Sequence, residues 1–370
     1  MDVSLYHDLD ELPDAYRSLF AQAGAINFFH SDAWFRPLIE TTRNEGDELR
    51  LYGVDGEGPG VPPLLLVARA APARLGPIRQ RVLSSFTNFY TMRGGPIIGA
   101  ESSDVDRVVG RVVSEICAER PRWDVIVMKA LEPDSRVYRA MSDAFRSAGL
   151  IVQPFFQHAS WFEPLAGRTF KDFMAARGSK IRKTLQWKNR KIEKSGRFRY
   201  EMVTDDSNLE AAIGAYERVY ERSWKEAESY PEFIPSLIAQ CARLGSLRLG
   251  IMYLDDEPVA TQLSLLSGTT AFQYKMAYDE TLATNPAAKN LSVGTVMILR
   301  LLEHLIEVDK VAEFDFGVGD EGFKSEWCTQ RREIWGLMAL NPRSPAGLAG
   351  AIRHVGGAQA QSAIKQLLGR

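Results

Sequence analysis

Asp315, Asp320 and Lys324 lie close together in the sequence, around three glycines. The segment 317–322 reads GVGDEG and follows a predicted strand. Carboxylates accept protons and lysines bind anions, so these three side chains could form a site at the end of that strand, where the glycines let a ligand approach the backbone. The alternative is a glycine-rich turn with a surface ion pair, since such pairs are common and nearly neutral in energy.

The same letters match the dinucleotide-binding pattern G-x-G-x-x-G, but the context does not fit. That pattern opens an α-helix within a βαβ unit near the start of a domain. Segment 317–322 contains two acids and lies far toward the end of the sequence. We therefore do not predict a dinucleotide site here.

A second candidate site is the start of a strongly apolar helix predicted over 292–308. Free backbone N–H groups and the helix dipole attract anions at such a position. A phosphate or pyrophosphate would fit, and the candidate groups are Lys289, Asn290, Ser292, Gly294 and Thr295. The alternative is a plain N-cap role for Ser292.

Ten basic residues and one acid, Glu193, lie between Arg177 and Arg199. Ile181, Leu185 and Ile192 fall near one face of a helix, so we predict an amphipathic helix over 177–199 with a basic outer face. Such a face is either simply solvated or a site for phosphate, nucleotide or RNA. A local charge of this size in a nearly neutral chain slightly favours the anion site.

The chain has 370 residues, of which 45% are hydrophobic and 25% charged, and its formal net charge is −2. This is a soluble globular composition, and the length predicts two domains. No apolar run approaches the roughly 20 residues that span a bilayer. The first residues also lack the basic and apolar segments of a signal peptide. We expect a cytoplasmic protein, and peripheral association with the inner face of the membrane stays open.

Three cysteines, Cys117, Cys241 and Cys328, are far apart and odd in number. This fits neither a disulfide framework nor a zinc site, so we expect three small buried side chains and no metal. The sequence also lacks G-x-S-x-G, H-E-x-x-H and a local Cys–His pattern. A direct transfer reaction is therefore favoured over a hydrolase.

Hydrophobic periodicity predicts the elements that must position these residues. In the first part we predict strands at 48–54, 64–69 and 123–129 and helices at 104–119 and 135–148. Helices at 205–224 and 235–244 then precede strands at 247–254, 259–266 and 270–278, the helix at 292–308 and a final strand at 311–316. On the helix at 292–308, His304 lies on the polar stripe and is not predicted to be catalytic. The tail has helical stretches around Ile352 and Leu367.

These elements indicate a mixed α/β (α+β) fold in two parts. We expect an N-terminal domain over 1–165, a C-terminal domain over 166–342 that contains the basic helix, and a tail over 343–370, more plausibly a frayed end than a docking segment.

The chain resembles GNAT acyltransferases, and more narrowly the CelD-type branch associated with cellulose and exopolysaccharide biosynthesis, which is related to Fem-type aminoacyltransferases. The resemblance is carried by residues 28–34, 88–90, 179–183, 222–225, 258–260, 292–294 and 314–324, of which the last segment is the most specific. It implies two tandem GNAT-like domains, each a mostly antiparallel sheet flanked by helices. The first would be degenerate and the second would hold the donor.

The resemblance implies N-acyl transfer, with acetyl as the expected group, from acyl-CoA to the amine of an aminosugar. The thioester would lie between the two central strands, with its pyrophosphate at the start of the helix, where the family often has Ser-Pro-Gly and this chain has Ser-Val-Gly. Backbone donors around Gln262 would polarise the carbonyl. The proton donor would be Tyr274 or Tyr278, and the base Asp315 or Asp320. The residues expected to bind an anionic acceptor are Lys180, Arg182, Lys183, Trp224 and Lys324.

Two other functions stay open. Fem-type relatives use aminoacyl-tRNA, and the basic helix could meet RNA phosphates, although this chain lacks the long helical hairpin of many Fem-type enzymes. A non-catalytic subunit of a membrane-bound polysaccharide synthesis complex, which would bind a partner or a cyclic dinucleotide, is the third. The glycine and serine at the helix start favour a working donor site over that reading.

Overall fold

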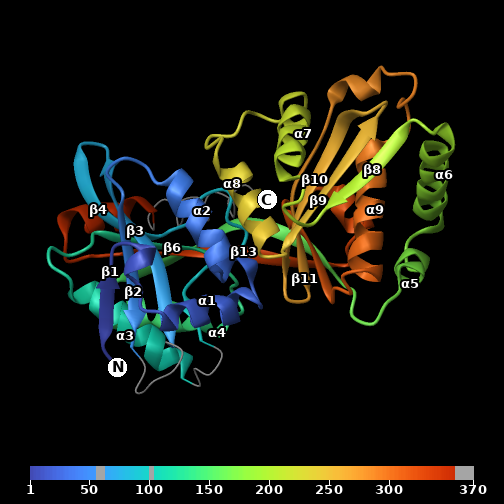
Figure 1. Cartoon of the computed structure of the whole chain (residues 1–370). Helices are drawn as coiled ribbons and strands as arrows, with labels where there is room; N and C mark the ends of the chain where they lie inside the picture. Colours follow the sequence, from blue (N-terminus) through green and yellow to red (C-terminus); the bar gives the residue numbers. More distant parts are fainter. Residues whose placement is uncertain (56–62, 100–103, 355–370) are drawn as a thin grey trace, which may run out of the picture.

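The computed structural model describes residues 1–55, 63–99 and 104–354, with the side chains of Lys180 and Ala283 outside the description. One continuous, twisted sheet runs through both halves of the chain, with helices packed on its faces (Figure 1). Its strand order is β1-β2-β3-β4-β6-β13-β7-β12-β11-β10-β9-β8, and the short β5 pairs with β3. Two pairs of adjacent strands, β4–β6 and β11–β12, are parallel, and the other pairs are antiparallel. The predicted fold class is confirmed.

The strands are β1 (Val3–Tyr6), β2 (Glu48–Val54), β3 (Leu64–Leu75), β4 (Ile78–Ser85), β5 (Ile97–Ile98), β6 (Val125–Leu131), β7 (Ile151–Pro164), β8 (Phe198–Val203), β9 (Leu247–Leu254), β10 (Glu257–Ser267), β11 (Thr270–Tyr278), β12 (Glu313–Val318) and β13 (Gln330–Leu340). The helices are α1 (Ala15–Gly24), α2 (Asp32–Thr42), α3 (Val105–Ala118), α4 (Arg136–Ser147), α5 (Phe170–Ala175), α6 (Ser179–Ser195), α7 (Leu209–Glu221), α8 (Phe233–Arg243) and α9 (Val293–Glu307). The short 3-10 helices of the described residues are η1 (Leu9–Glu11), η2 (Phe28–His30), η3 (Glu280–Ala283) and η4 (Gly322–Glu326).

Strand β13 corrects the prediction that 311–316 holds the final strand. It lies between β6 and β7, and β7 in turn pairs with β12. Each half therefore contributes a strand next to the other half's sheet. Strand β13 was not predicted because it begins with four polar residues, Gln330, Arg331, Arg332 and Glu333. In the fold, Arg331 pairs with Asp320 and Arg332 pairs with Glu313.

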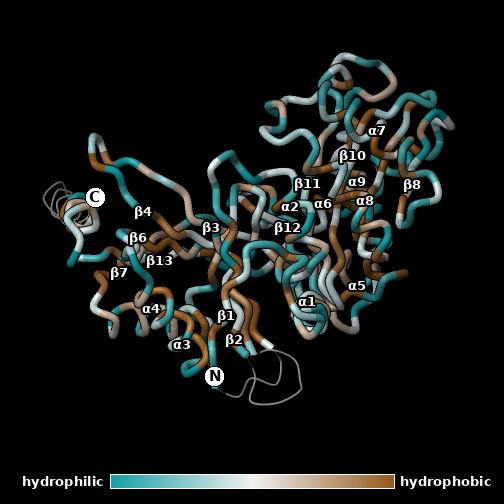
Figure 2. The backbone as a smooth tube through the Cα atoms, turned by 60° about the vertical axis from the view of Figure 1, so that its left-hand side comes forward, coloured by the Kyte–Doolittle hydropathy of each residue, from teal (hydrophilic) through white to brown (hydrophobic). Residues whose placement is uncertain are grey.

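Apolar side chains form cores in both halves, and one core crosses between them. Hydrophobic segments, brown in Figure 2, run through the sheet at both ends of the molecule. The Phe29 ring lies 5.4 Å from that of Phe272, and the Trp34 ring lies 5.6 Å from that of Phe233. The short helix η2 of the first half therefore packs against β11 of the second, and α2 packs against α8, which makes the junction part of the core.

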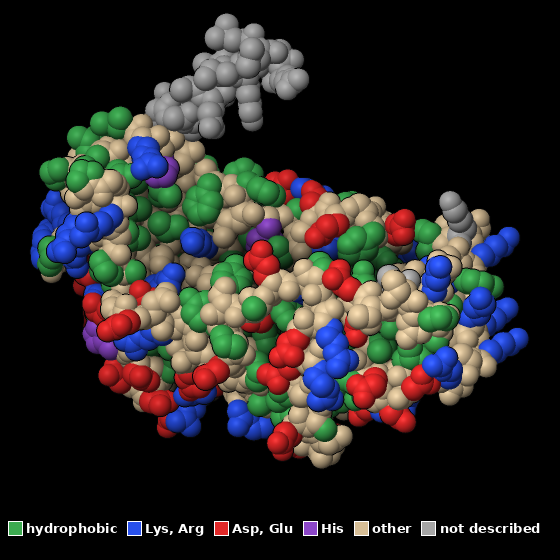
Figure 3. All heavy atoms as spheres, turned by 90° about the horizontal axis from the view of Figure 1, so that it is seen from above, with side chains coloured by type: hydrophobic (Ala, Val, Ile, Leu, Met, Phe, Trp, Pro, Cys, Tyr) green, Lys and Arg blue, Asp and Glu red, His purple; other side chains and the backbone are tan. Residues whose placement is uncertain are grey.

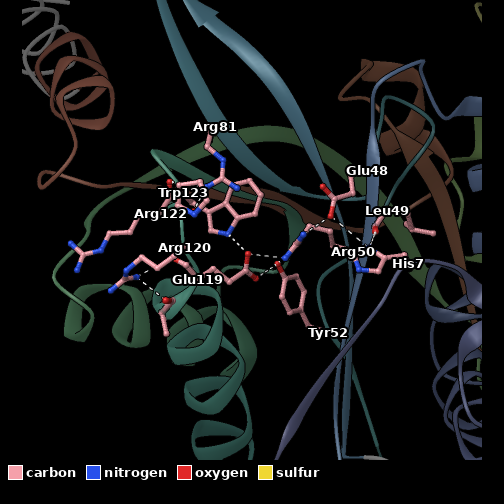
Figure 4. Close-up of polar contacts among 12 residues, drawn as sticks. His7, Glu48, Leu49, Arg50, Tyr52, Arg81, Glu119, Arg120, Arg122 and Trp123 are labelled. Carbon is pink, nitrogen blue, oxygen red and sulfur yellow. Dashed lines mark hydrogen bonds and ion pairs between the residues drawn. The ribbon is translucent and has the colours of Figure 1, made fainter.

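A polar cluster closes the outer part of the N-terminal half (Figure 4). The Glu119 carboxylate accepts hydrogen bonds from Arg50 Nη2 at 2.7 Å, Tyr52 Oη at 2.6 Å and Trp123 Nε1 at 3.1 Å. Arg50 and Arg81 place their guanidinium carbons 5.4 and 4.4 Å from the Trp123 ring centre. Because these groups satisfy one another, the cluster ties the end of α3 to β2 and the start of β6.

Three smaller predictions need correction or completion. Cys241 and Cys328 are buried as expected, but Cys117 is only half-buried. Residues 345–354 are helical and include Ile352, whereas Leu367 lies outside the described residues. Within 1–55, 63–99 and 104–354, none of the helices has both the length and the apolar character needed to cross a bilayer.

Candidate active site

The two parallel strands at the centre of the C-terminal half part soon after they begin. Register pairing of β11 with β12 is confined to Thr270–Phe272 opposite Glu313–Asp315, although both strands continue. At Gly317 the backbone has φ +77°, and a Cβ there would lie 2.4 Å from the Gln273 carbonyl oxygen. Beyond this close approach the two strands no longer pair with each other and leave an opening, which suits an extended ligand.

Two adjoining pockets occupy this opening. The larger, of about 560 Å³, is lined by residues of β11 and β12, by the loop after α7 and by Phe89 and Tyr90. The smaller, of about 370 Å³, reaches the first turn of α9. Both are lined by Met276, Tyr278 and Phe323, so the pockets meet at these side chains.

The start of α9 supplies four of the predicted donor-binding residues to the smaller pocket. Asn290, Ser292, Gly294 and Thr295 line it, whereas Lys289 is exposed and does not. Ser292 has φ +50°, and its side chain makes no capping hydrogen bond. Ser292 is thus the N-cap residue by position, but its hydroxyl accepts a hydrogen bond from Lys188 Nζ of α6 at 2.6 Å and does not cap the helix. A cation beside a helix start strengthens its attraction for anions.

The two tyrosines predicted as proton donors have different surroundings. Tyr278 is 39% exposed, lies 4.5 Å from Trp224 between ring centres and lines both pockets. Tyr274 also lines the larger pocket, but its hydroxyl donates to the Tyr90 carbonyl at 3.2 Å. Burial raises the pKa of Tyr274 well above its ordinary value. Tyr278 is therefore better placed to give a proton to a bound group.

Asp315 lies outside both pockets, in a buried ion-pair cluster. Its Oδ2 is 2.6 Å from Arg93 Nη2, and its Oδ1 accepts hydrogen bonds from the Ser160 hydroxyl and the Gly317 N–H. Burial alone would raise the pKa of Asp315, but the charges of Arg93 and Arg332 and these hydrogen bonds keep it below the ordinary value. A charged carboxylate satisfied in this way is suited to holding structure and poorly suited to taking a proton.

The expected grouping of Asp315, Asp320 and Lys324 does not form. The Asp320 carboxylate, half-exposed, pairs with Arg331 at 2.8 Å and accepts from Trp161 Nε1 at 2.9 Å. Lys324 Nζ instead pairs with Glu321 at 2.9 Å and donates to the Val318 carbonyl at 2.6 Å. Of the three, Lys324 alone lines the larger pocket. The glycine segment runs into the short η4 and not into an α-helix, which agrees with the rejection of a dinucleotide site.

Gln262 lies on β10, one strand away from the opening. Its backbone stands between β9 and β11, opposite Gly250 and Met276, and its side chain amide donates to Gln273 at 2.7 Å. The strand edges at the opening belong to β11 and β12, so backbone donors for a carbonyl would come from β11.

The predicted basic helix is shorter than expected. Arg177 lies before α6 and is buried in an ion pair with Glu163, and Arg197 and Arg199 flank or join β8. Arg182 and Lys183 lie on α6 and line neither pocket, and the Lys180 side chain lies outside the description. Lys and Arg side chains gather at the end of the molecule formed by α6 (Figure 3). Trp224 is the other predicted acceptor residue that lines the larger pocket.

Sequence reasoning assigned no role to Tyr90, Lys225, Glu228 and Lys275, which meet around the larger pocket. Lys275 Nζ pairs with Glu228 at 2.6 Å, and the Tyr90 hydroxyl donates to the same carboxylate at 2.5 Å. Tyr90 and Lys225 stand within the segments that carry the family resemblance. This resemblance was the one sequence feature that could have pointed to Tyr90 and Lys225. The proximity of all four residues could not be predicted, because they come from three separate segments of the chain.

The opening between the two parallel strands thus lies beside the first turn of α9. Residues 179–325 match a family model described as an acetyltransferase (GNAT) domain. This segment contains β11, α9, β12 and both ends of the opening. This part of the chain is therefore similar to GNAT-type acetyltransferase domains. Among the described residues, no group of three or more His, Cys, Asp or Glu is placed to hold a metal ion.

Solved structures similar to this chain cover both of its halves. A structure of FemX is 10% identical, with a TM-score of 0.62, over 92% of this chain and 98% of that one. The C-terminal domain of a putative lysylphosphatidylglycerol synthetase from Agrobacterium fabrum is 12% identical, with a TM-score of 0.53, over 91% and 97%. L-PGS from Bacillus licheniformis is 12% identical, with a TM-score of 0.50, over 84% and 89%. At these identities the likeness shows the fold alone. The comparison with curated proteins finds no match.

Proposed function

We propose that this chain is an N-acyltransferase that moves an acyl group, with acetyl the first to test, from acyl-CoA to an aminosugar of a cell-surface polysaccharide or its precursor. The observation that carries the proposal is the parting of β11 and β12 beside the first turn of α9. It lies within the segment that matches the acetyltransferase model. The CelD-type assignment, the cytoplasmic location and contact with membrane-bound synthesis machinery belong to this proposal and rest on the sequence.

The proposed reaction is a direct transfer. The amine nitrogen attacks the thioester carbonyl carbon, so a C–N bond forms, the C–S bond breaks, the amine loses a proton and the thiolate gains one. Tyr278 is the proposed proton donor because it stands where the two pockets meet. Glu321 lines the larger pocket and its side chain is exposed, so it replaces Asp315 and Asp320 as the proposed proton acceptor, directly or through water. Its ion pair with Lys324 would have to open for this role.

Ligand-dependent thermal stability tests the donor site without knowledge of the acceptor. Acetyl-CoA, longer acyl-CoAs and free CoA should raise the unfolding midpoint, with about 2.7 kcal/mol of stabilisation at 100 times Kd. The Gly294→Glu variant should lose this rise, because its Cβ would lie 3.3 Å from the Tyr278 ring and its carboxylate would repel phosphate. Gly110→Glu on α3 is the matched control, since a side chain there meets nothing within 4 Å. An unfolding midpoint that no CoA species raises would refute the proposal.

Transfer from aminoacyl-tRNA is the second candidate, and the surface of α6 favours it. Lys183, Arg190, Lys191 and Lys194 are exposed, and Trp187 between them is 50% exposed. Basic side chains around an aromatic ring suit nucleic acid, and binding should then weaken steeply with salt. Retention of deacylated tRNA that falls between 50 and about 200 mM salt, without a response to CoA, would support this candidate. A response to neither ligand would favour a non-catalytic subunit.

A further inference from the structure

The larger pocket is lined by three lysines that come from three separate elements. Lys225 belongs to the loop after α7, Lys275 to β11 and Lys324 to η4. No arginine lines this pocket, and the walls include the rings of Phe89, Trp224 and Phe323. Flat aromatic faces beside ammonium groups suit a ligand that combines a ring with an anion.

Two of the three ammonium groups are already neutralised. Lys275 Nζ lies 2.6 Å from Glu228, and Lys324 Nζ lies 2.9 Å from Glu321. Lys225 is half-buried, and within the described part of the chain no carboxylate oxygen lies within 4.0 Å of its Nζ. The Lys225 Nζ lies 5.6 Å from the centre of the Trp224 ring.

Both like and opposite charges lie around Lys225, although none of the described carboxylates is within ion-pair distance of it. Burial lowers the pKa of Lys225, and the charges of Lys275 and Lys324 lower it further, while Glu228 and Glu321 raise it. An anion bound in the pocket would relieve the repulsion among the lysines. A charge placed on the wall of a pocket, without a partner of its own, is therefore a binding feature.

We infer that Lys225 binds a phosphate group of the acceptor, so that the acceptor is a phosphorylated aminosugar. The inference deepens the proposed function and rests on it for the identity of the reacting amine. The pocket on which it depends adjoins the α9 pocket at Tyr278 but excludes the α9 residues, which assigns this anion to the acceptor and not to the donor.

The choice of phosphate follows from the cations present. Lysine binds phosphate as a point charge, whereas planar, two-point recognition of a carboxylate is the usual role of arginine. A phosphate also has more charge than a carboxylate at neutral pH. The phosphate could belong to a free sugar phosphate or to a sugar linked through diphosphate to a nucleotide or lipid carrier, and these sources share the same chemistry.

Calorimetric titration of the full chain without any acyl donor tests this inference. The probes are glucosamine, glucosamine 1-phosphate, UDP-glucosamine, glucuronate and inorganic phosphate. Glucosamine 1-phosphate or UDP-glucosamine should bind about tenfold or more tightly than glucosamine, and Lys225→Gln should remove most of that difference. Lys225→Arg should retain it in part. Lys171→Gln on α5, an exposed lysine far from the pocket in the chain, is the matched control and should retain all of it.

Each outcome of this titration either supports or overturns the inference. A preference for the monoester over UDP-glucosamine identifies a free sugar phosphate, and the reverse identifies a carrier-linked sugar. Equal affinity for glucosamine and its phosphates, glucuronate binding as tightly as the phosphates, or no binding of any sugar overturns the inference. So does a folded Lys225→Gln variant that binds sugar phosphates normally or loses only CoA binding. Failure of the proposed function itself would show in the separate CoA experiment.

Discussion

Asp315 joins segments that are far apart in the sequence. Arg93 follows β4 in the N-terminal half, Ser160 lies on β7 and Arg332 lies on β13, and all three contact or approach the Asp315 carboxylate. The Asp315 side chain is 1% exposed, and its contacts tie β7 and β13 to β12. Its chemistry is therefore that of a buried structural carboxylate.

Replacement of Asp315 by Asn should destabilise the protein by at most about 3–5 kcal/mol, because Arg93 would lose its shortest ion pair and keep the longer ones with Glu313 and Glu132. The urea unfolding midpoint measures the effect. The lowered pKa means that the wild-type contribution is complete above the ordinary carboxylate range and is lost as the pH falls through the folded-state pKa. The difference between variant and wild type should therefore shrink in acid. An unchanged midpoint with lost turnover would instead mark Asp315 as a catalytic residue.

At the scale of elements, the site depends on how β11 and β12 approach and then part. Gly317 permits the close approach, because φ +77° favours glycine and a Cβ would lie 2.4 Å from the Gln273 carbonyl oxygen. The opening begins beyond this point, and α9 directs its first turn into it.

Gly317→Ala should cost more stability than the backbone strain alone, which is about 1–3 kcal/mol. The added methyl group would also push β12 away from β11 and weaken the response to acyl-CoA. Gly167→Ala separates the two effects, since Gly167 has φ +72° with nothing within 4 Å. Denaturant midpoints and the CoA-induced thermal shift provide the measurements. Equal losses in the two variants would show that the contact with Gln273 has no energetic consequence.

At the scale of the whole molecule, the two halves share a sheet and a core. Strand β13 pairs with both β6 and β7, and Phe29 and Trp34 pack against Phe272 and Phe233. Separation of the halves would expose aromatic rings and leave strand edges unpaired. The boundary predicted at residue 165 stays a prediction, but it falls directly after a strand that pairs with β12.

We expect the halves to unfold together. Calorimetry should show one transition, coincident with far-ultraviolet circular dichroism and tryptophan fluorescence, as for a single cooperative unit. Acyl-CoA, which would contact the second half alone, should shift the whole transition. Two resolved transitions, with one insensitive to the ligand, would contradict this.

The sequence determined the elements whose patterns are local. The meander over 247–278 and the helix over 292–308 were predicted within a few residues, because period-2 and period-3.6 apolar spacing is a property of each segment alone. Local patterns and family resemblance also predicted several residues that the fold brings to the adjoining pockets. These are Tyr278, Ser292, Gly294, Thr295, Trp224 and Lys324.

Only the tertiary structure decided which polar groups have partners. Asp315 and Lys324 are nine residues apart in the chain, yet one is held by Arg93 and the other by Glu321. Local sequence does not distinguish Lys225 from Lys275, but Glu228 pairs with Lys275, and no carboxylate of the described residues pairs with Lys225. The placement of β13 between β6 and β7 was equally hidden. Charge pairing and strand order depend on contacts between distant segments, and local spacing does not encode those contacts.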